Sequence, residues 1–319
     1  MGPDNYRILK ALLRNPLAII GFFLLGFFLL IAILAPVLAP PLGSDPYDIP
    51  RDGFSAIPEP PGTEWGSRQP PLPGWWEPLT GRSEWVHPFG TASGGYDIYY
   101  GVIWGVRTAF KVGIIVTGTG LIIGLLFGSI SAYYGGWVDM VLMRITDIFL
   151  AFPFLVAALT MAAVLTPKFG RSIWPAIVAI VFFGWMGYAR LIRGDILAVR
   201  EREYVTAARV IGTPDWQILL RHILPNAIFP TMVVASLEIG TVVITFAALS
   251  FLGVGVERGY ADWGQLIAFA RDWITDLNTY WYIVLFPGLA IVLFVLGWNL
   301  VGDALRDVFD PRMRGAGGA

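Results

Sequence analysis

The chain has 319 residues, of which 56% are hydrophobic and 14% charged, and its formal net charge is −1. Soluble domains average roughly 45–50% apolar and about 25% charged residues, so this composition argues against a soluble domain and favours a chain that lies in lipid. The near-zero charge gives no reason to expect a nucleic acid partner, and the absence of cysteine excludes disulfides, thiol catalysis and cysteine metal sites.

Six apolar runs follow one another along the chain. A membrane-spanning helix needs about 20 mostly apolar residues. The runs are continuous and not alternating, which favours helices over a β-barrel. We therefore expect an all-α integral membrane protein with six transmembrane helices, at residues 17–35, 112–132, 141–165, 174–192, 227–252 and 283–301. The first run follows three basic residues and leads into prolines, so we interpret it as a retained signal-anchor helix.

The basic residues are divided unevenly between the loops. If the N-terminus is cytoplasmic, residues 1–16, 190–226 and 302–319 together carry twelve Arg and Lys in about 70 positions, against eight in about 110 positions on the other side. Short loops rich in Arg and Lys remain on the cytoplasmic side. We therefore predict that both termini are cytoplasmic. The terminal contributions come from Arg7, Lys10, Arg14, Arg306, Arg312 and Arg314.

The first outer loop, residues 36–97, is dense in Pro, Gly and Trp and carries eight acidic residues between Asp45 and Asp97. Proline removes a backbone donor and fixes φ, so we expect extended and turn structure here and no helices. Its tryptophans have two interpretations. They belong to a partly ordered surface loop, or they form an interfacial anchor or docking rim for an external partner. The residues concerned are Trp65, Trp75, Trp76 and Trp85.

A polar segment, residues 201–226, separates the fourth and fifth apolar runs. Its first part has good helix formers, with Tyr204, Ala208 and Ile211 at the spacing of a one-sided apolar stripe. Gly212 is placed to end this helix as its C′ residue.

A second short helix is predicted after this corner. Thr213 is the expected N-cap, Pro214 the first helical residue, and Asp215 lies in the first turn. Pro225 is expected to end the helix. Two interpretations of this bent segment remain open: an amphipathic connector in the lipid headgroup region, or a docking element that inserts into a groove of a cytoplasmic protein.

Residues 204–226 resemble the EAA loop of the membrane subunits of binding-protein-dependent ABC importers. That pattern reads E-A-A, three residues, G, nine residues, I-x-L-P. Thr206-Ala207-Ala208 stands at the E-A-A position, Gly212 at the glycine and Leu224-Pro225 at the end. Thr206 replaces the usual Glu, and His222 replaces the Ile, as is typical of the dipeptide/oligopeptide branch.

Further motifs resemble the same branch, and they follow one another in the family's order. The chain is similar to the C-type permease subunit of a dipeptide/oligopeptide importer over nearly its whole length, except about residues 52–85. Ala92 and Tyr96 stand where the family has an acid and an arginine, which is a departure from its pattern. The motifs lie at residues 14–40, 143–153, 250–255, 262–267 and 299–312.

This resemblance implies a type I ABC importer permease fold with a large extracytoplasmic loop between the first two helices. The expected organisation comprises an N-terminal tail and first helix (1–40), the Pro/Trp-rich loop (41–103), a transmembrane domain (104–302) with a coupling loop (193–226), and a C-terminal tail (303–319). The coupling-loop residues expected to contact an ATPase are Glu203, Tyr204, Thr206, Ala207, Ala208, Arg209, Gly212, Asp215, Trp216, Leu224 and Pro225.

The resemblance further implies that the chain is not an enzyme, but half of the translocation path for di- or oligopeptides in a bacterial or archaeal cytoplasmic (inner) membrane. The expected partners are two ATP-binding cassette subunits (or a heterodimer of them), a second permease subunit, an extracytoplasmic solute-binding protein and the lipid bilayer. Alternative solutes in this branch are nickel complexes, glutathione and oligosaccharides.

Charged residues inside the apolar runs are functional candidates. Arg144 and Asp147, spaced i, i+3, are predicted to form a structural charge pair. Glu238 lies well inside the fifth run. It either faces the translocation path, where it would contact a peptide amine, or forms a hydrogen bond to a neighbouring helix.

Uphill transport requires an energy source, and this sequence contains no phosphate-binding loop motif for ATP. The three lysines, Lys10, Lys111 and Lys168, do not follow a glycine as the G-x-x-x-x-G-K-[ST] motif requires. The chain therefore uses a separate ATPase or an ion gradient. An ion-coupled carrier favours paired acids at mid-membrane and repeated halves, whereas Glu238 is the one deep acid. No cofactor, metal or nucleic acid is expected.

Overall fold

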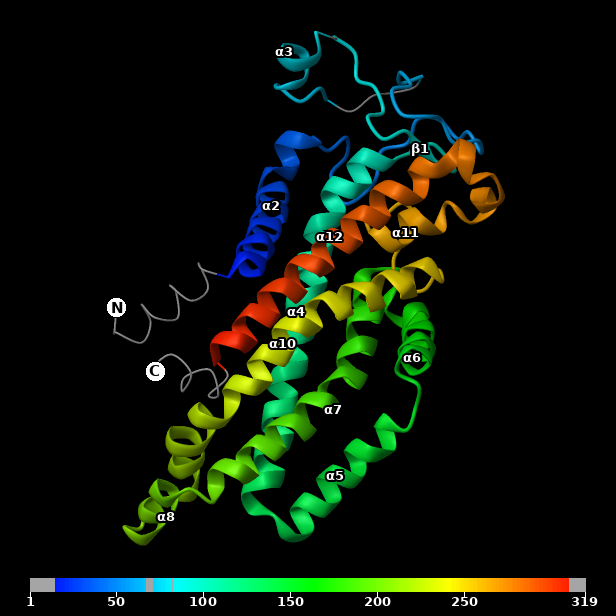
Figure 1. Ribbon diagram of the computed structural model, residues 1–319. Helices are drawn as coiled ribbons and strands as arrows, with labels where there is room; N and C mark the ends of the chain where they lie inside the picture. Colours follow the sequence, from blue (N-terminus) through cyan, green and yellow to red (C-terminus); the bar gives the residue numbers. More distant parts are fainter. Residues whose placement is uncertain (1–14, 67–70, 82, 310–319) are drawn as a thin grey trace.

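The computed structural model describes residues 15–66, 71–81 and 83–309. They form an elongated bundle of helices with a layer of loops at one end (Figure 1). The prediction of a helical membrane protein is confirmed, since five of the described helices are long and apolar enough to cross a membrane. Several basic residues that contributed to the predicted orientation lie outside the described ranges: Arg7, Lys10, Arg14, Arg312 and Arg314.

The first apolar run forms α2 (Pro16–Leu38). Asn15 caps this helix by accepting two hydrogen bonds from backbone amides of its first turn. Most of its apolar side chains are exposed, and its buried edge lies against α12 (Leu277–Phe309). The two helices approach closely, because a Cβ on Gly21 would lie 2.8 Å from the Cβ of Leu300. The rest of α2 presents a wide apolar face to lipid or to another protein.

The centre of the bundle is the pair formed by α4 (Ile98–Tyr134) and α7 (Ile173–Arg200). Small residues let membrane helices approach closely enough for extensive van der Waals contact. At Gly128 of α4, an added Cβ would lie 2.3 Å from Cγ2 of Ile192 and 2.4 Å from the carbonyl oxygen of Ala189. Glycine is therefore required at this point of contact.

The third apolar run, predicted as a continuous helix over residues 141–165, is broken. It forms α5 (Gly136–Leu150) and α6 (Phe154–Phe169), whose axes are bent by 85°. Pro153 lies at the break. Because proline lacks an amide hydrogen and disfavours helical geometry in the residue before it, the helix ends here and a new one begins. The pair counts as a sixth span only if the two halves are taken together.

The C-terminal half packs against this centre. α10 (Leu224–Phe251) lies beside α12 and contacts both α4 and α7. A short helix, α11 (Trp263–Ala268), fits between α10, α12 and α4, and the buried Trp263 indole donates a hydrogen bond to the carbonyl of Val102 at 3.1 Å. A 3₁₀ turn, η2 (Arg271–Asp276), then leads into α12.

Residues 39–66, 71–81 and 83–97 form the loop layer, which lies over the ends of α2 and α4 (Figure 1). It contains the antiparallel pair β1 (Thr91–Ala92) and β2 (Tyr96–Asp97). It also contains α3 (Trp76–Thr80), so the prediction that this loop has no helices was wrong. The one proline of α3, Pro78, lies in the first turn of that helix, where a missing amide hydrogen costs no helical hydrogen bond.

The tryptophans of the loop layer pack inside it. Trp76 and Trp85 are buried, with their ring centroids 4.5 Å apart, and Trp85 also meets Tyr99 of α4 edge to face. The indole of Trp75 donates to the carbonyl of Val37 in α2 at 3.0 Å. These side chains therefore attach the layer to the helix ends, and Trp76 and Trp85 form no exposed rim.

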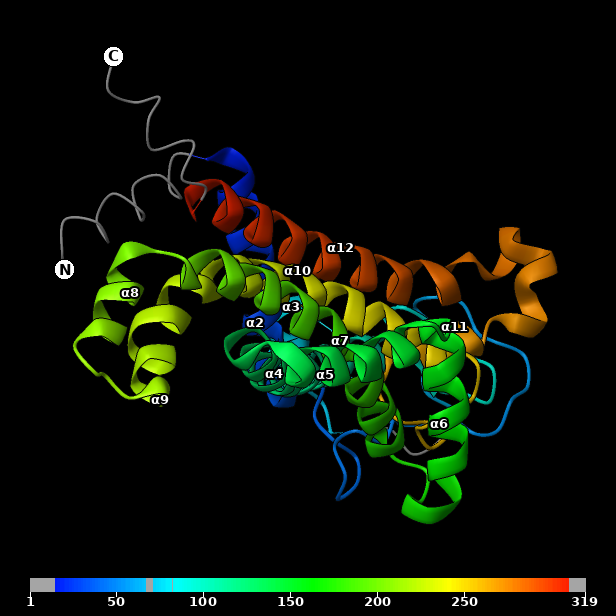
Figure 2. The ribbon, with the colours of Figure 1, turned by 90° about the horizontal axis from the view of Figure 1, so that it is seen from below.

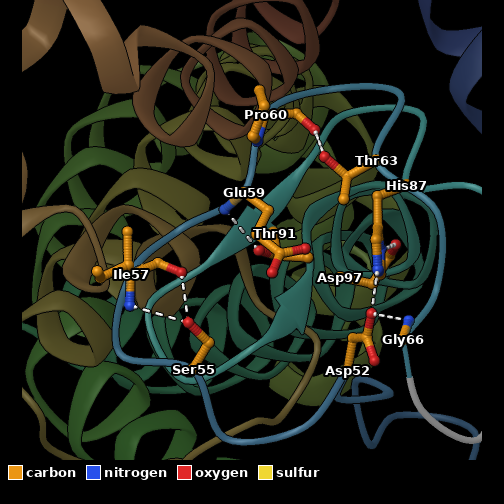
Figure 3. A network of polar contacts seen from close by, with 10 residues as sticks. All are labelled: Asp52, Ser55, Ile57, Glu59, Pro60, Thr63, Gly66, His87, Thr91 and Asp97. Carbon is orange, nitrogen blue, oxygen red and sulfur yellow. Dashed lines mark hydrogen bonds and ion pairs between the residues drawn. The ribbon is translucent and has the colours of Figure 1, made fainter.

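A buried histidine connects β2 with an irregular segment of the loop layer (Figure 3). His87 is fully buried, with Nδ1 2.6 Å from a carboxylate oxygen of Asp97 and Nε2 3.2 Å from a carboxylate oxygen of Asp52. The ring of Trp65 covers the imidazole at 4.3 Å between centroids. Burial lowers the pKa of His87, but its hydrogen bonds and the charges of Asp97 and Asp52 outweigh burial and raise the pKa above 6.5 overall.

This arrangement predicts that the loop layer loosens as pH rises. A histidine whose folded pKa is raised stabilises the fold fully below its unfolded pKa of 6.5, and this contribution is lost as pH rises through the folded pKa. Hydrogen exchange at the amides of Gly66 and Tyr100, which donate to Asp52 and Asp97, should show greater opening above that pKa. Comparable pH dependence in His87→Gln would contradict the assignment to His87.

The contact between α4 and α7 gives a second prediction. Gly128→Ala should destabilise the purified protein in detergent by about 1–3 kcal/mol, because the added methyl overpacks against α7. Gly118→Ala is the matched control on the same helix, since nothing lies within 4 Å of its Cβ position. Thermal unfolding measures both variants, and equal midpoints would contradict the close contact.

Candidate functional site

The segment of residues 201–226 projects from the end of the bundle opposite the loop layer (Figures 1 and 2). It begins with α8 (Glu203–Val210). Gly212 follows with a φ of +80°, a left-handed conformation that favours glycine, so the predicted corner is confirmed. The chain continues as α9 (Asp215–Gln217) and a π-helical turn, η1 (Ile218–Ile223).

Two details of the predicted second helix were wrong. Pro214, and not Thr213, is the N-cap, and no side chain caps the helix. Pro225 does not end it, because η1 leads directly into α10, with Pro225 in the first turn of that helix. In the π turn the amide of Leu224 donates five residues back, to Leu219. The regular α-helical hydrogen-bond pattern is already interrupted at such a turn. A proline that follows it, which has no amide hydrogen to donate, therefore breaks no regular pattern.

The buried face of α8 also differs from the predicted stripe. Ala208 is buried as expected, but Tyr204 is 44% exposed and Ile211 80% exposed. Val205 takes their place, and together with Ala208 it packs on η1 and on the ends of α4 and α7. In a helix of only eight residues, the buried side chains are those on the face that meets neighbouring elements. The spacing of apolar residues within α8 did not indicate which face that is.

Four large apolar side chains around the corner of the segment are exposed, and we refer to them together as the exposed apolar patch: Val210, Ile211, Trp216 and Leu220. Their exposed fractions are 82%, 80%, 58% and 54%. Such a patch beside polar residues is typical of a protein contact or a membrane surface. Among the other residues predicted to contact an ATPase, Ala208 is buried and Leu224 is half-buried. The rest are exposed: Glu203, Tyr204, Thr206, Ala207, Arg209, Gly212, Asp215 and Pro225.

Tyr133, at the end of α4, contacts both limbs of this segment. Its hydroxyl donates a hydrogen bond to the Asp215 carboxylate at 2.6 Å. The guanidinium of Arg209 lies 5.9 Å from the centre of its ring, within the range of a weak cation–π contact. Arg200 of α7 donates to the carbonyls of Ala132 and Tyr133 at 2.9 and 3.3 Å, so the last turn of α4 is held from two sides.

Ion pairs join α5 to α7. Arg193 donates two hydrogen bonds to Asp139, each of 2.5 Å, and such bidentate pairs fix geometry as well as charge. Asp147 pairs with Arg190. The predicted pair of Arg144 with Asp147 is therefore wrong for the described residues: a partner 43 positions away occupies the carboxylate.

Glu238 lines a small cavity between four helices, α4, α6, α7 and α10. The cavity has a volume of about 40 Å³, room for a few water molecules at most, and not for a peptide. Glu238 is half-buried. The polar atoms around it come mainly from hydroxyl groups, those of Thr117, Tyr188, Thr241 and Thr245.

The sequence did not predict Tyr133, Asp139, Arg193 or the hydroxyl groups of the cavity as site residues. Tyr133 and Asp215 are 82 positions apart, and Asp139 and Arg193 are 54 apart. No local spacing connects residues at such separations. The packing of the 201–226 segment on the end of α4 brings Tyr133 to Asp215, and the packing of α5 on α7 brings Asp139 to Arg193.

Comparisons with known proteins place the chain among transport components. Residues 120–315 match the family model described as "Binding-protein-dependent transport system inner membrane component". Residues 6–61 match the model of the "N-terminal TM domain of oligopeptide transport permease C".

Two relatives identified by sequence are permease proteins as well. The dipeptide transport system permease protein DppC of Alkalihalophilus pseudofirmus is 36% identical over 305 residues, covering 96% of this chain and 89% of that protein. The glutathione transport system permease protein GsiD of Pectobacterium atrosepticum is 38% identical, covering 72% and 74%. Among solved structures, a chain of the MetNI methionine ABC transporter gives a TM-score of 0.48 at 21% identity, covering 66% of this chain and 97% of that one.

Proposed function

The chain belongs to the family of binding-protein-dependent transport system inner membrane components, and from this premise we propose that it forms half of the translocation path of a di- or oligopeptide importer. It is a permease subunit of an ABC importer and not itself an enzyme. Importers of this class work with ATPase and binding-protein partners. We further propose two ATP-binding cassette subunits, a second permease and an extracytoplasmic binding protein as those partners.

The exposed apolar patch carries the proposal that the 201–226 segment is where the ATPase subunits dock. Apolar side chains exposed at 82% and 80% on a corner of fixed shape suit insertion into a groove of another protein. Burial of Val205 and Ala208 beneath α8 holds that corner against the bundle. A displacement of the docked partner would therefore move the ends of α4 and α7 as well.

This assignment carries an orientation with it. We propose that the 201–226 segment and both termini are cytoplasmic and that the loop layer is extracytoplasmic, in a bacterial or archaeal cytoplasmic membrane. The basic residues of the described chain support a cytoplasmic position for the segment and for the end of α12. They are Arg190, Arg193, Arg200, Arg202, Arg209, Arg221 and Arg306. In this organisation, α5 and α6 together form the third of six spans. The coupling loop lies within a transmembrane domain of residues 104–302.

We place Glu238 in the translocation path. It supplies the one carboxylate among the residues that line the 40 Å³ cavity, and a peptide brings an ammonium group that a carboxylate binds. The cavity is too small to hold a peptide, so in this proposal the peptide moves along the path shared with the second permease and meets Glu238 at the wall of that path. An ion-coupled carrier that works alone is disfavoured by the family to which the chain belongs.

Peptides are the proposed solute because a dipeptide permease is 36% identical over 96% of the chain. Glutathione is the second candidate, since a glutathione permease is 38% identical over 72% of it. Both solutes carry a free ammonium group, so the proposed role of Glu238 is the same for either. Uptake of labelled dialanine and labelled glutathione by the complete complex distinguishes the two.

Docking is tested by charging the exposed patch. Ile211→Glu should remove most of the ATPase subunits that co-purify with the permease, because a carboxylate buried in the interface without a partner costs several kcal/mol. Leu79→Glu is the matched control, since Leu79 is 76% exposed but lies in the loop layer. Undiminished co-purification with Ile211→Glu would refute docking at this patch.

The path is tested by removing the charge of Glu238. Glu238→Gln should lower uptake of whichever solute the complex imports about tenfold or more, the expected effect of losing a hydrogen bond to a charged group. ATPase co-purification should remain unchanged. Glu257→Gln, an exposed acid outside the cavity, is the control. If Glu238→Gln transports as well as the control, Glu238 has no part in the path.

A further inference from the structure

Tyr133 is placed to connect the 201–226 segment with the rest of the bundle. The segment bends at Gly212, and the two limbs on either side of this corner are α8 and the α9–η1 helix. Tyr133 contacts Arg209 on the first limb and Asp215 on the second. A change of angle at the corner alters both contacts together.

The Tyr133 side chain is itself held in place. It is 8% exposed and belongs to the apolar cluster that includes Val205, Ala208 and Ile218 of the segment. Asp215, by contrast, is exposed. The hydrogen bond therefore joins a fixed phenol to a carboxylate on a surface helix, and it can break and form again without burying an unpaired charge.

α4 runs without an internal proline from Tyr133 to the wall of the Glu238 cavity. Thr117 and Gly120 of α4 line that cavity. At about 1.5 Å per helical residue, Thr117 lies roughly 24 Å along the axis from Tyr133. A continuous helix transmits a displacement over this distance, and Gly128 seats it directly on α7.

We propose that Tyr133 is the positioning residue through which a displacement of the 201–226 segment reaches α4, and through α4 the wall of the Glu238 cavity. This inference rests on the proposed docking of ATPase subunits at the same segment. The hydroxyl acts by keeping the end of α4 in register with the Asp215 limb. Without it, the segment still docks, but its movement reaches the cavity less completely.

The absence of cysteine from the chain permits a direct readout. In a Thr241→Cys parent, a maleimide reports access to the cavity wall, since Thr241 is exposed and lines the cavity. The labelling rate is measured on the complete complex in membranes, without nucleotide and with ATP plus vanadate. The difference between the two rates measures how far nucleotide binding at the ATPase changes the cavity.

Tyr133→Phe removes one oxygen atom and keeps the ring. It should lower the nucleotide-dependent change in labelling about two- to tenfold, the range expected for the loss of one hydrogen bond. The labelling rate without nucleotide and the amount of co-purified ATPase should not change. Tyr134→Phe is the control, since Tyr134 is adjacent but 61% exposed.

Asp215→Asn gives an independent check on the same bond. It should lower the nucleotide-dependent change in labelling as Tyr133→Phe does, with labelling compared at equal amounts of co-purified ATPase because Asp215 lies in the docking segment. The double variant should be no worse than either single one, because both remove the same interaction. Additive effects, a full nucleotide response in Tyr133→Phe, or a parent that does not respond to nucleotide would overturn the inference. Loss of co-purified ATPase in Tyr133→Phe would also overturn it, since the residue would then act in assembly. The docking proposal is judged separately, by Ile211→Glu.

Discussion

The close approach of α4 and α7 is the contact on which the remaining structure depends. Between helices in lipid there is little hydrophobic driving force, so association relies on van der Waals packing and hydrogen bonds. Gly120, Gly124 and Gly128 lie on one face of α4 and contact α7 between Gly184 and Ile192. Because α4 extends from the loop layer to the 201–226 segment, this contact fixes both ends of the molecule relative to the cavity between them.

Three acids of the helices, Asp139, Asp147 and Glu238, differ in whether an arginine pairs with them. Asp139 and Asp147 each have an arginine partner on α7 and hold α5 against it. Glu238 has no ion-pair partner among the described residues and lines a cavity whose other polar side chains are three threonines and Tyr188. A charge near the middle of a membrane that is not neutralised within its own chain is costly to keep, which is consistent with a solute supplying the opposite charge during transport.

The sequence predicted those features that local chemistry determines. Lipid demands long apolar helices, so the predicted runs fall on the helices of the structure, although α4, α7 and α12 extend well beyond the predicted ends and the third run is broken. Gly212 adopts the positive φ expected at the corner. Features that depend on distant partners could not be predicted. Asp147 has a helical neighbour in Arg144 but pairs with Arg190, and the face that α8 buries is chosen by the ends of α4 and α7. Glu238 was identifiable because an acid is unusual in an apolar run, whereas the threonines and the tyrosine around it are not.

The π-helical turn at Ile218–Ile223 has a consequence for the angular phase of α10. A π turn accommodates an extra residue relative to an α-helix, and each residue accommodated in this way rotates everything that follows by about 100° about the helix axis. A helical wheel that is drawn without a break from Asp215 through α10 therefore places the residues after the π turn on the wrong side of the helix. The π turn therefore affects which side of α10 carries Glu238, although it ends about four helical turns before that residue.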